Sequence, residues 1–506
     1  MTTQPPTPGS APAGASTASA SASRRAESPR AESIESKSID FVPLDERKGS
    51  VASLFPLWFM SNANLTTLAT GMLGVAMGAT FGASVLAILL GVAVGTVFTA
   101  FHSAQGPQLG LPQMLQSRAQ FGYRGVAVVC LVTILSIVGF NVFNQILAGE
   151  VLTATTGVDV PQLWYVVITA LALALAVVGY HWIHRTQQWL TLLFLATFGV
   201  FSVAAIFVLP LPIEQLGLGD FAWPAFLVQF AGAAGYGLGW APYVSDYSRY
   251  LAPRTSPIAA TFYTYAGVFV GASWLMVLGA FVAATFAADA SPIAAVAAVA
   301  ESVLPGSSPW LLIAALPGLV SVITVNIYAA SIEGITVVDS FRPLAATRRV
   351  RVIACSIVAL VGMSGALFST GDFLDNFGSF LVILLYVLVP WTSINLVDYY
   401  VVRKGRYAIL EMFKADGVYG AWGWRGLTAY AIGIVAMVPF AVTTWFVGPV
   451  AEAIGGIDVA LFVGLVVGAV AYLLLCVGLD RREEERVIQE ALEAGGPASV
   501  SFHGER

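Results

Sequence analysis

Charge is scarce in this sequence. Asp, Glu, Lys and Arg make up 10% of its 506 residues, and the formal net charge is −5. The 24 basic residues form no patch that could hold nucleic acid, so we expect no nucleic-acid partner. The three cysteines lie in apolar runs without a CxxC partner, which argues against a disulfide framework. His181 and His184 are only a weak metal signal, and we expect no metal site.

Motifs for catalysis and for transport driven by nucleotide hydrolysis are also missing. The sequence has no GxxxxGK(S/T) loop, and its GAAGYGLG stretch lies inside a hydrophobic run rather than after a strand. Neither a nucleotide-driven pump nor a dinucleotide site is indicated, so energy must come from an ion gradient unless the protein is a passive facilitator. No clustered nucleophile points to a membrane-embedded enzyme or receptor, and we expect neither catalysis nor a cofactor.

Long apolar runs are what the sequence has in abundance. Hydrophobic residues account for 57% of the chain, and the mean hydropathy is +0.80. Runs of about 20 residues, the length that crosses a bilayer, repeat along the chain. We therefore predict an all-α integral membrane protein with about twelve transmembrane helices. The predicted spans are 52–78, 83–104, 125–152, 161–180, 187–209, 222–247, 257–285, 309–333, 352–369, 373–398, 426–448 and 457–479.

The basic residues follow the predicted spans. All 24 Lys and Arg fall in the two tails and the even-numbered loops, and none falls in an odd-numbered loop. Because cytoplasmic loops carry the Lys and Arg excess, this pattern supports twelve spans and predicts that both termini are cytoplasmic. We expect a plasma (inner) membrane protein with a disordered cytoplasmic tail at 1–38, a transmembrane transporter domain at 39–480 and a cytoplasmic tail at 481–506.

Two predicted spans carry features that interrupt a helix. Span 1 reads FPLWFMSNANLTTLATGMLG, with Asn62 and Asn64 in a polar cluster near mid-depth. Span 6 reads AGAAGYGLGWAPY, where glycines including Gly237 precede Trp240 and Pro242, and we predict a break near these glycines. Breaks at matching places in two five-span halves are typical of inverted-repeat transporters, which bind substrate and ion there. The alternative is that both are kinked packing helices.

Aromatic and amide side chains in the spans suit a flat, polar-edged ligand. Phe140 and Asn144 share one face of span 3, Trp240 lies in span 6 and Asn326 in span 8. The two rings can sandwich a nucleobase while the carboxamides offer donor and acceptor groups to its edge. The candidate substrate-binding residues are Asn62, Asn64, Phe140, Asn144, Gly237, Trp240 and Asn326. The alternative is that the asparagines only bond across helices.

Carboxyl groups inside or near the spans are candidate ion-coupling groups, because charge is costly in a bilayer. Most of them lie near predicted cytoplasmic ends. They are Glu150, Asp246, Glu333, Asp339 and Asp398. Glu150, near the outer end of span 3, can titrate during transport, whereas Asp246 is better explained as a structural ion-pair partner of Arg249.

Four longer stretches carry a family signature. They are IDFVPLDERKGS before span 1, GPQLGLPQMLQSRAQFG between spans 2 and 3, GLGWAPYVSDYSRYLAP at span 6 and NLVDYYVVRKGRY at the end of span 10. These stretches resemble the purine-cytosine permease family, also called nucleobase:cation symporter family one, and the resemblance covers residues 39 to about 480. It implies a 5+5 inverted-repeat core like that of amino acid transporters, with helices 1 and 6 broken, plus two C-terminal helices.

The resemblance also implies which residues hold substrate. In the fungal and bacterial purine-cytosine permease branch, which looks closest, the substrate is held at positions that match Phe140, Asn144, Trp240 and Asn326. Phe140 stands where a tryptophan is often found, which keeps a ring but weakens stacking. Members take up cytosine, purines, uracil, allantoin, hydantoins or thiamine-like heterocycles, so the resemblance does not fix the substrate.

The resemblance bears on the coupling ion as well. Sodium-coupled relatives use two adjacent hydroxyls in span 8, where this chain has Val320 and Ser321, so one hydroxyl is missing and proton coupling is favoured. The candidate coupling residues are Ser321, Thr324 one turn away, and Glu150. We expect cation-coupled import, with the proton as the favoured ion, of a nucleobase such as cytosine or a purine by alternating access. The same fold carrying allantoin, a hydantoin, a thiamine-like compound or an amino acid with sodium stays open, as does the oligomeric state.

Overall fold

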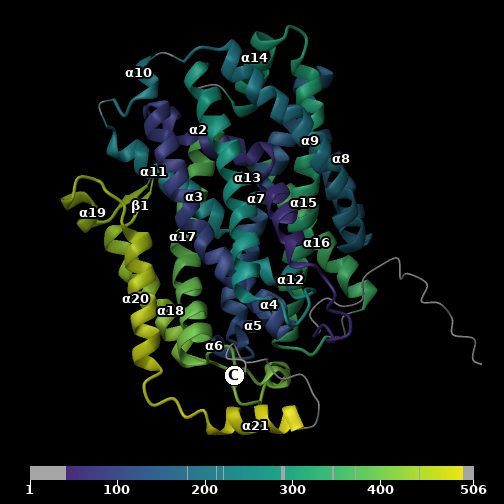
Figure 1. The fold of residues 1–506 in the computed structure, drawn as a ribbon, viewed down its shortest axis with the longest axis vertical. Helices are drawn as coiled ribbons and strands as arrows, with labels where there is room; N and C mark the ends of the chain where they lie inside the picture. The colour runs from purple at the N-terminus through teal and green to yellow at the C-terminus, as the bar shows by residue number, and fades with distance from the viewer. Residues whose placement is uncertain are drawn as a thin grey trace, which may run out of the picture. The chain divides into compact units, whose positions relative to one another are not determined.

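Helices make up most of the described chain in the computed structural model (Figure 1). The structure describes residues 41–493 except 179, 212, 220, 287–290, 345–346, 371 and 444, and gives only the backbone of 178 and 180–191. These residues belong to one unit by their mutual contacts. The predicted N-terminal tail, 1–38, lies outside the described residues, as do the last thirteen residues of the predicted C-terminal tail.

Each of the first five predicted spans coincides with a helix or a broken helix pair. Span 1 is a pair, α1 and α2, and spans 2 to 5 are single helices. Their bounds are α1 (Leu54–Asn62), α2 (Leu65–Ala76), α3 (Phe81–Ser103), α7 (Val126–Thr156), α8 (Pro161–Val178) and α9 (Tyr180–Val208).

The second half repeats this order and the chain then adds two helices. Span 6 is again a broken pair, α11 and α12, and it is followed by four single helices before the C-terminal α18 and α20. Their bounds are α11 (Trp223–Leu238), α12 (Val244–Ser248), α13 (Pro257–Thr285), α15 (Ser308–Asp339), α16 (Arg348–Phe368), α17 (Phe373–Val397), α18 (Trp424–Met437) and α20 (Ala460–Leu475). The predicted number of spans and the predicted breaks in spans 1 and 6 are confirmed.

Short elements between the spans were not predicted. They are too brief to show as apolar runs of bilayer length. They are the helices α4 (Gln105–Leu109), α5 (Gln113–Gln116), α6 (Arg118–Phe121), α10 (Ile213–Leu216), α14 (Pro292–Val303), α19 (Pro449–Ala453) and α21 (Arg482–Glu493), the turns η1 (Val51–Ser53), η2 (Ala241–Tyr243), η4 (Ile409–Phe413) and η5 (Val438–Phe440), the π-helical turn η3 (Asp398–Val402), and a hairpin of β1 (Val442–Thr443) and β2 (Phe446–Val447). In Figure 1, α14 lies at one end of the helix bundle and α21 at the other, and we name the two ends by these helices.

The break in span 1 is made by three consecutive residues. α1 ends at Asn62, Ala63 leaves helical geometry with ψ 74°, and Asn64 is fully extended before α2 starts. The Oδ1 atom of Asn64 accepts the backbone N–H groups of Thr66 and Thr67 at 3.0 and 3.1 Å. A helix that begins inside a membrane has no water to satisfy these donors, so the side chain of Asn64 caps α2.

The break in span 6 follows from glycine and proline. α11 ends at Leu238, and Gly239 and Trp240 lead into η2, which contains Pro242. Proline lacks the N–H that would continue the α-helical bonding, so the chain tightens into a 3-10 turn. A Cβ atom at Gly239 would lie 3.2 Å from the ring of Phe140, so glycine lets span 3 approach the break.

The spans pack with backbone against backbone where small residues allow it. A Cβ atom added to Gly279 of α13 would lie 1.9 Å from the carbonyl oxygen of Leu68 in α2, and one added to Gly71 would lie 1.9 Å from that of Met276. Small residues at a helix interface permit such close approach in membranes. The two glycines therefore fix α2, the second half of span 1, against span 7.

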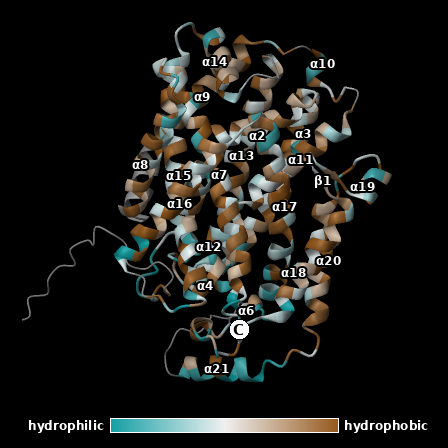
Figure 2. Cartoon of the chain, turned by 180° about the vertical axis from the view of Figure 1, so that it is seen from behind, coloured by the Kyte–Doolittle hydropathy of each residue, from teal (hydrophilic) through white to brown (hydrophobic). Residues whose placement is uncertain are grey.

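Apolar side chains also cover the outside of the bundle. In Figure 2 the hydrophobic colour runs along the spans, whereas α21 is largely hydrophilic. Leu135, Phe207 and Ile258 expose 71%, 85% and 81% of their surface, which a protein in water would hide. Among the described residues, six helical stretches are each long and apolar enough to cross a bilayer, and the other apolar helices are shorter. These surfaces face lipid.

We expect Gly279→Val to destabilise the fold, because the new side chain must push α2 away from α13. Overpacking of a tight core costs about 1–3 kcal/mol, so the detergent-solubilised variant should melt at a lower temperature in fluorescence-detected size-exclusion chromatography. The matched control is Gly199→Val in α9, where an added Cβ atom meets nothing within 4 Å. Equal melting temperatures for the two variants would contradict this packing account.

Candidate functional site

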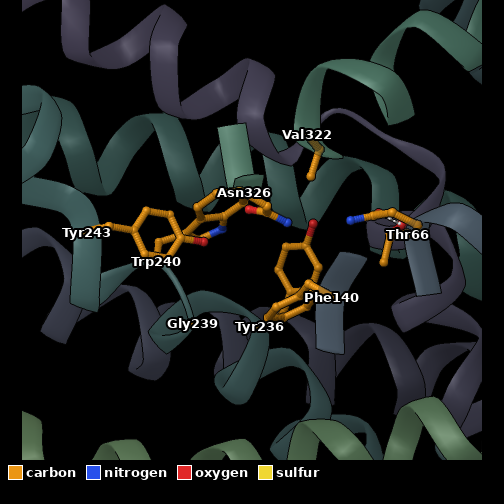
Figure 3. A pocket seen from close by; sticks show the side chains of 9 residues that line it. Thr66, Phe140, Tyr236, Gly239, Trp240, Tyr243, Val322 and Asn326 are labelled. Carbon is orange, nitrogen blue, oxygen red and sulfur yellow. Dashed lines mark hydrogen bonds between the residues drawn. The ribbon is translucent and has the colours of Figure 1, made fainter. Parts of the chain in front are cut away.

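A cavity lies where the two helix breaks meet spans 3 and 8 (Figure 3). The space within it that a water-sized sphere can occupy is about 10 Å³, so the side chains close around it in this structure. The side chains come from α2, α7, α11, the break that follows α11, η2 and α15. The lining residues are Thr66, Phe140, Asn144, Tyr236, Gly239, Trp240, Tyr243, Val322 and Asn326.

Four of the seven predicted substrate residues line this cavity: Phe140, Asn144, Trp240 and Asn326. Each is at most 7% exposed, so the site is shielded from both surfaces. None of the lining residues is an acid or a base. The cavity is therefore suited to an uncharged ligand with an aromatic face and polar edges.

The amides of the cavity retain unused hydrogen-bonding capacity. Asn144 accepts a hydrogen bond from the hydroxyl of Thr66 through Oδ1, but its Nδ2 donor has no partner among the described residues. The Oδ1 acceptor of Asn326 also has none. Leaving a buried polar atom unpaired costs about 1–3 kcal/mol, so a donor and an acceptor left open in one cavity are the mark of a ligand site.

Trp240 is fixed by its neighbours rather than free to turn. Its Nε1–H donates to Oδ1 of Asn62 at 3.0 Å, and Asn62 in turn donates to the carbonyl oxygen of Trp58 at 2.6 Å. The rings of Trp58 and Tyr243 lie 5.7 and 5.5 Å from that of Trp240, both edge to face. The indole is thus set in place before a ligand arrives, which reduces the ordering cost of binding.

The other three predicted substrate residues lie behind the cavity wall. Asn62 holds Trp240, and Asn64 caps α2 while its Nδ2 lies 3.5 Å from the hydroxyl of Tyr236. Gly237 turns away from the cavity, because its carbonyl oxygen accepts from the hydroxyl of Thr99 in α3 at 2.7 Å. These residues position the lining instead of forming it.

The predicted coupling residues do not line the central cavity either. The hydroxyl of Thr324 is buried and donates to the carbonyl oxygen of Val320 at 2.7 Å, and Ser321 is half-buried on α15. Glu150 lines a second cavity at the α14 end, of about 350 Å³, together with Asp372 and Ser291. Glu150 is therefore separated from the central cavity.

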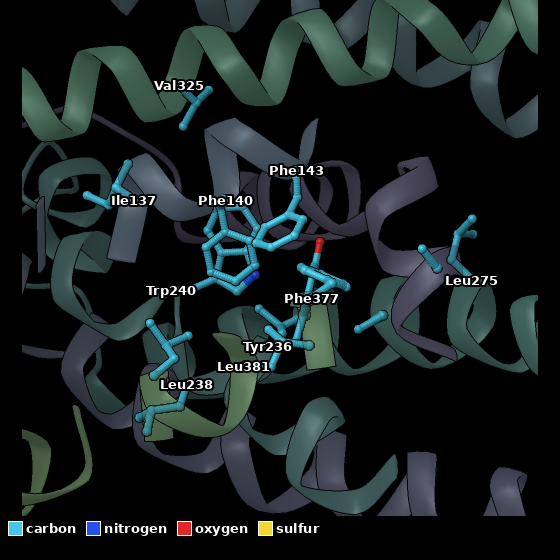
Figure 4. Packing of buried hydrophobic residues seen from close by; sticks show 14 of the residues in the cluster. Ile137, Phe140, Phe143, Tyr236, Leu238, Trp240, Leu275, Val325, Phe377 and Leu381 are labelled. Atoms are coloured by element: carbon cyan, nitrogen blue, oxygen red, sulfur yellow. The ribbon is translucent and has the colours of Figure 1, made fainter. Parts of the chain in front are cut away.

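A cluster of phenylalanine rings from α7 and α17 stands between these two cavities (Figure 4). Phe140 lines the central cavity and its ring lies 5.1 Å from that of Phe380. Phe143 and Phe373 line the second cavity, and Phe143 lies 4.8 Å from Phe377. We call these five residues the phenylalanine barrier. It closes the central cavity toward the α14 end.

The opposite side of the cavity is closed by the loop that follows span 2. Its short helices are buried beneath the span 6 break, where the backbone N–H of Gln113 donates to Oδ1 of Asp246 at 2.9 Å. Ser245 donates to Oε1 of Gln113 at 2.5 Å, and Ser248 donates to the carbonyl oxygen of Ser103 at 2.8 Å. Two of the four signature stretches therefore meet here and close the α21 end.

Five lining residues were not predicted as substrate residues: Thr66, Tyr236, Gly239, Tyr243 and Val322. Two of them could have been predicted from helical spacing. Val322 precedes Asn326 by four residues and Tyr236 precedes Trp240 by four, so each pair shares a helix face. Tyr243 could not be found in this way, since its direction depends on the tight turn at η2. The direction in which side chains point after a break depends on the backbone geometry of that break.

Residues 41–464 match the family described as permease for cytosine/purines, uracil, thiamine, allantoin. The chain belongs to this permease family. YxlA of Bacillus subtilis, which carries a provisional name as a purine-cytosine permease, is 38% identical over 86% of the chain and 94% of its own length. The purine-cytosine permease fcyB of Emericella nidulans is 24% identical over 84% and 85%, respectively.

A solved structure shows the same fold. The nucleobase-cation-symport-1 family transporter Mhp1, in a closed conformation with bromovinylhydantoin bound, superposes with a TM-score of 0.71 at 18% identity, covering 89% of this chain and 98% of Mhp1. The all-α inverted-repeat architecture of a multi-pass membrane transporter is thereby confirmed for this permease, and it is a transporter rather than an enzyme.

The contacts of the permease distinguish structural asparagines from binding asparagines. We expect Asn64→Ala to lower the unfolding free energy by about 1 kcal/mol, as the loss of an N-cap does. Asn326→Ala should leave stability unchanged or slightly higher, because its Oδ1 atom has no partner to lose. Thermal unfolding of both purified variants without substrate measures the difference, and a larger loss for Asn326→Ala would contradict the assignment.

Proposed function

We propose that this permease imports a nucleobase, of the cytosine or purine type, by proton symport through alternating access. The observation that carries the proposal is the pair of open amide groups, Nδ2 of Asn144 and Oδ1 of Asn326, in a cavity walled by Phe140 and Trp240. A nucleobase has a donor and an acceptor on one edge and two aromatic faces, so it satisfies both amides and both rings.

The charge of the cavity supports the same ligand class. The free space in this structure is about 10 Å³, room for about one water, so the side chains must move apart to admit a base. A carboxylate or amino acid would want a cation beside it, and the cavity lining contains none. The relatives named as purine-cytosine permeases favour a nucleobase over the other heterocycles of the family.

The choice of proton as coupling ion is supported by span 8. Val320 has no hydroxyl, and the hydroxyl of Thr324 is already bound to the carbonyl oxygen of Val320. A sodium site here would have few oxygen ligands to use. A buried carboxyl, in contrast, can bind and release a proton without further ligands.

Alternating access requires that the cavity open to one side at a time. The phenylalanine barrier and the loop after span 2 close it on both sides in this structure. The placement of every Lys and Arg in the tails and even-numbered loops supports cytoplasmic termini. The α21 end would then face the cytoplasm of a plasma membrane, and import would run from the α14 end to the α21 end.

The test is uptake of labelled cytosine and hypoxanthine into cells that lack their own base permeases, with and without an uncoupler. We expect uptake that falls with the uncoupler. Trp240→Ala and Asn326→Ala should each lower it about tenfold or more, since each removes a buried contact worth about 1–3 kcal/mol.

The matched control is Trp310→Ala, which changes an exposed tryptophan outside the cavity. It should keep wild-type uptake, with equal amounts of each variant in the membrane. Normal uptake by Trp240→Ala or Asn326→Ala would contradict the site, and failure of the unaltered protein to take up or bind any base would contradict the function.

A further inference from the structure

One acidic residue of α15 has no role in the site described above. Glu333 follows Asn326 by seven residues, which places the two on the same face of the helix, about 10 Å apart along its axis toward the α21 end. Asn326 lines the central cavity, whereas Glu333 lies further along α15, between Asn326 and Asp339, whose carboxyl pairs with Arg118 of α6. A single rigid helix therefore carries both a ligand amide and a carboxyl group.

Among the described residues, no charged nitrogen pairs with Glu333. The residue is 0% exposed, and neither carboxyl oxygen accepts a hydrogen bond from a nitrogen or hydroxyl donor among the described residues. The titratable groups that act on it are the carboxyl of Asp246 from α12 and the thiol of Cys130 from α7. A thiol is only a weak donor, and Asp246 has the same sign of charge.

The buried cations of nearby elements bind other partners. The guanidinium of Arg118 in α6 donates to Oδ2 of Asp339 at 2.9 Å and to the carbonyl oxygen of Met412 at 3.1 Å. That of Arg351 in α16 lies over the ring of Tyr328, 5.0 Å from its centroid. No ion pair of Glu333 with Lys, Arg or His occurs in the described part of the chain.

A carboxyl group in this place must hold a proton. An ionised carboxylate without partners is strongly disfavoured away from water, and in membrane proteins such groups mark ion pathways. From this geometry we propose that Glu333 is the proton-carrying residue of the transporter. The inference rests on the proposed base–proton symport and assigns its coupling site.

The position of Glu333 explains how proton and base are released together. When the α21 end opens, water reaches Glu333, and its carboxyl transfers the proton to water to leave a carboxylate and a hydronium ion. The new negative charge faces Asp246, which is fixed by the backbone N–H of Gln113. Repulsion between α15 and α12 then favours the open state, and the same movement separates Asn326 from Trp240 on either side of the base.

The test compares two transport modes of protein reconstituted in proteoliposomes, with radiolabelled cytosine and hypoxanthine as probes. A pH step of one unit can drive about tenfold accumulation when one proton moves with each base. We expect Glu333→Gln, which imitates the protonated form, to lose this accumulation but to keep counterflow exchange within about twofold of wild type, because exchange needs no net proton movement. Glu333→Asp should retain part of the accumulation.

A second readout is the pH dependence of base binding. Wild-type affinity should fall about tenfold per pH unit once Glu333 deprotonates, whereas that of Glu333→Gln should stay flat. The matched control, Glu452→Gln, changes an exposed glutamate of α19 and should behave as wild type in both assays. Accumulation by Glu333→Gln at the wild-type level would overturn the inference, and so would loss of counterflow in Glu333→Gln and Glu333→Asp alike, which would indicate a structural role.

The wild-type arm separates this inference from the function on which it rests. If wild-type protein accumulates neither base under any gradient, the proposed function fails before the variants are compared. If it accumulates base under a sodium gradient but not under a pH step, base transport stands and Glu333 is overturned as the proton carrier.

Discussion

The structure depends on interrupting two helices inside a membrane without leaving backbone groups unsatisfied. Lipid offers no hydrogen bonds, so each interruption needs internal partners. Asn64 supplies them for α2 through its Oδ1 atom, and the tight turn η2 supplies them between α11 and α12. Once the breaks exist, polar side chains and turns of backbone lie at mid-depth, where an unbroken helix would present only apolar groups. The cavity is a consequence of this constraint.

The same constraint divides the asparagines into two groups. Asn62 and Asn64 lie at the break, and their side chains form hydrogen bonds within the protein. Asn62 holds Trp240 and Asn64 caps α2. Asn144 and Asn326 lie on the unbroken helices α7 and α15, where the backbone needs no help, and each keeps one polar atom open. Unbroken helices thus present the open amides and the ring of Phe140, and the broken span 6 presents Tyr236 and Trp240. Glu333 extends this division, since it too projects from an unbroken helix.

Much of the fold could be predicted from the sequence because hydropathy and basic residues report directly on the membrane. The twelve spans and both breaks follow from apolar runs, from the position of Lys and Arg, and from the glycines and Pro242 of span 6. The site was predicted in part: Phe140, Asn144, Trp240 and Asn326 line the cavity, but Gly237 and Asn64 lie behind it. Rotation of a helix about its axis is fixed by packing, such as that of Gly239 against Phe140, and spacing alone does not show it. The buried loop after span 2 escaped prediction because its helices are shorter than a span.

We propose that a nucleobase binds at the helix breaks, between Phe140 and Trp240. A cryo-electron microscopy or crystal structure of the protein with cytosine or hypoxanthine would show where the base lies. We expect density for the base in the cavity at the two rings, with one edge within hydrogen-bond distance of Nδ2 of Asn144 and Oδ1 of Asn326. Density for the base at another place, such as the cavity beside Glu150, with the central cavity still closed around its own side chains, would contradict it.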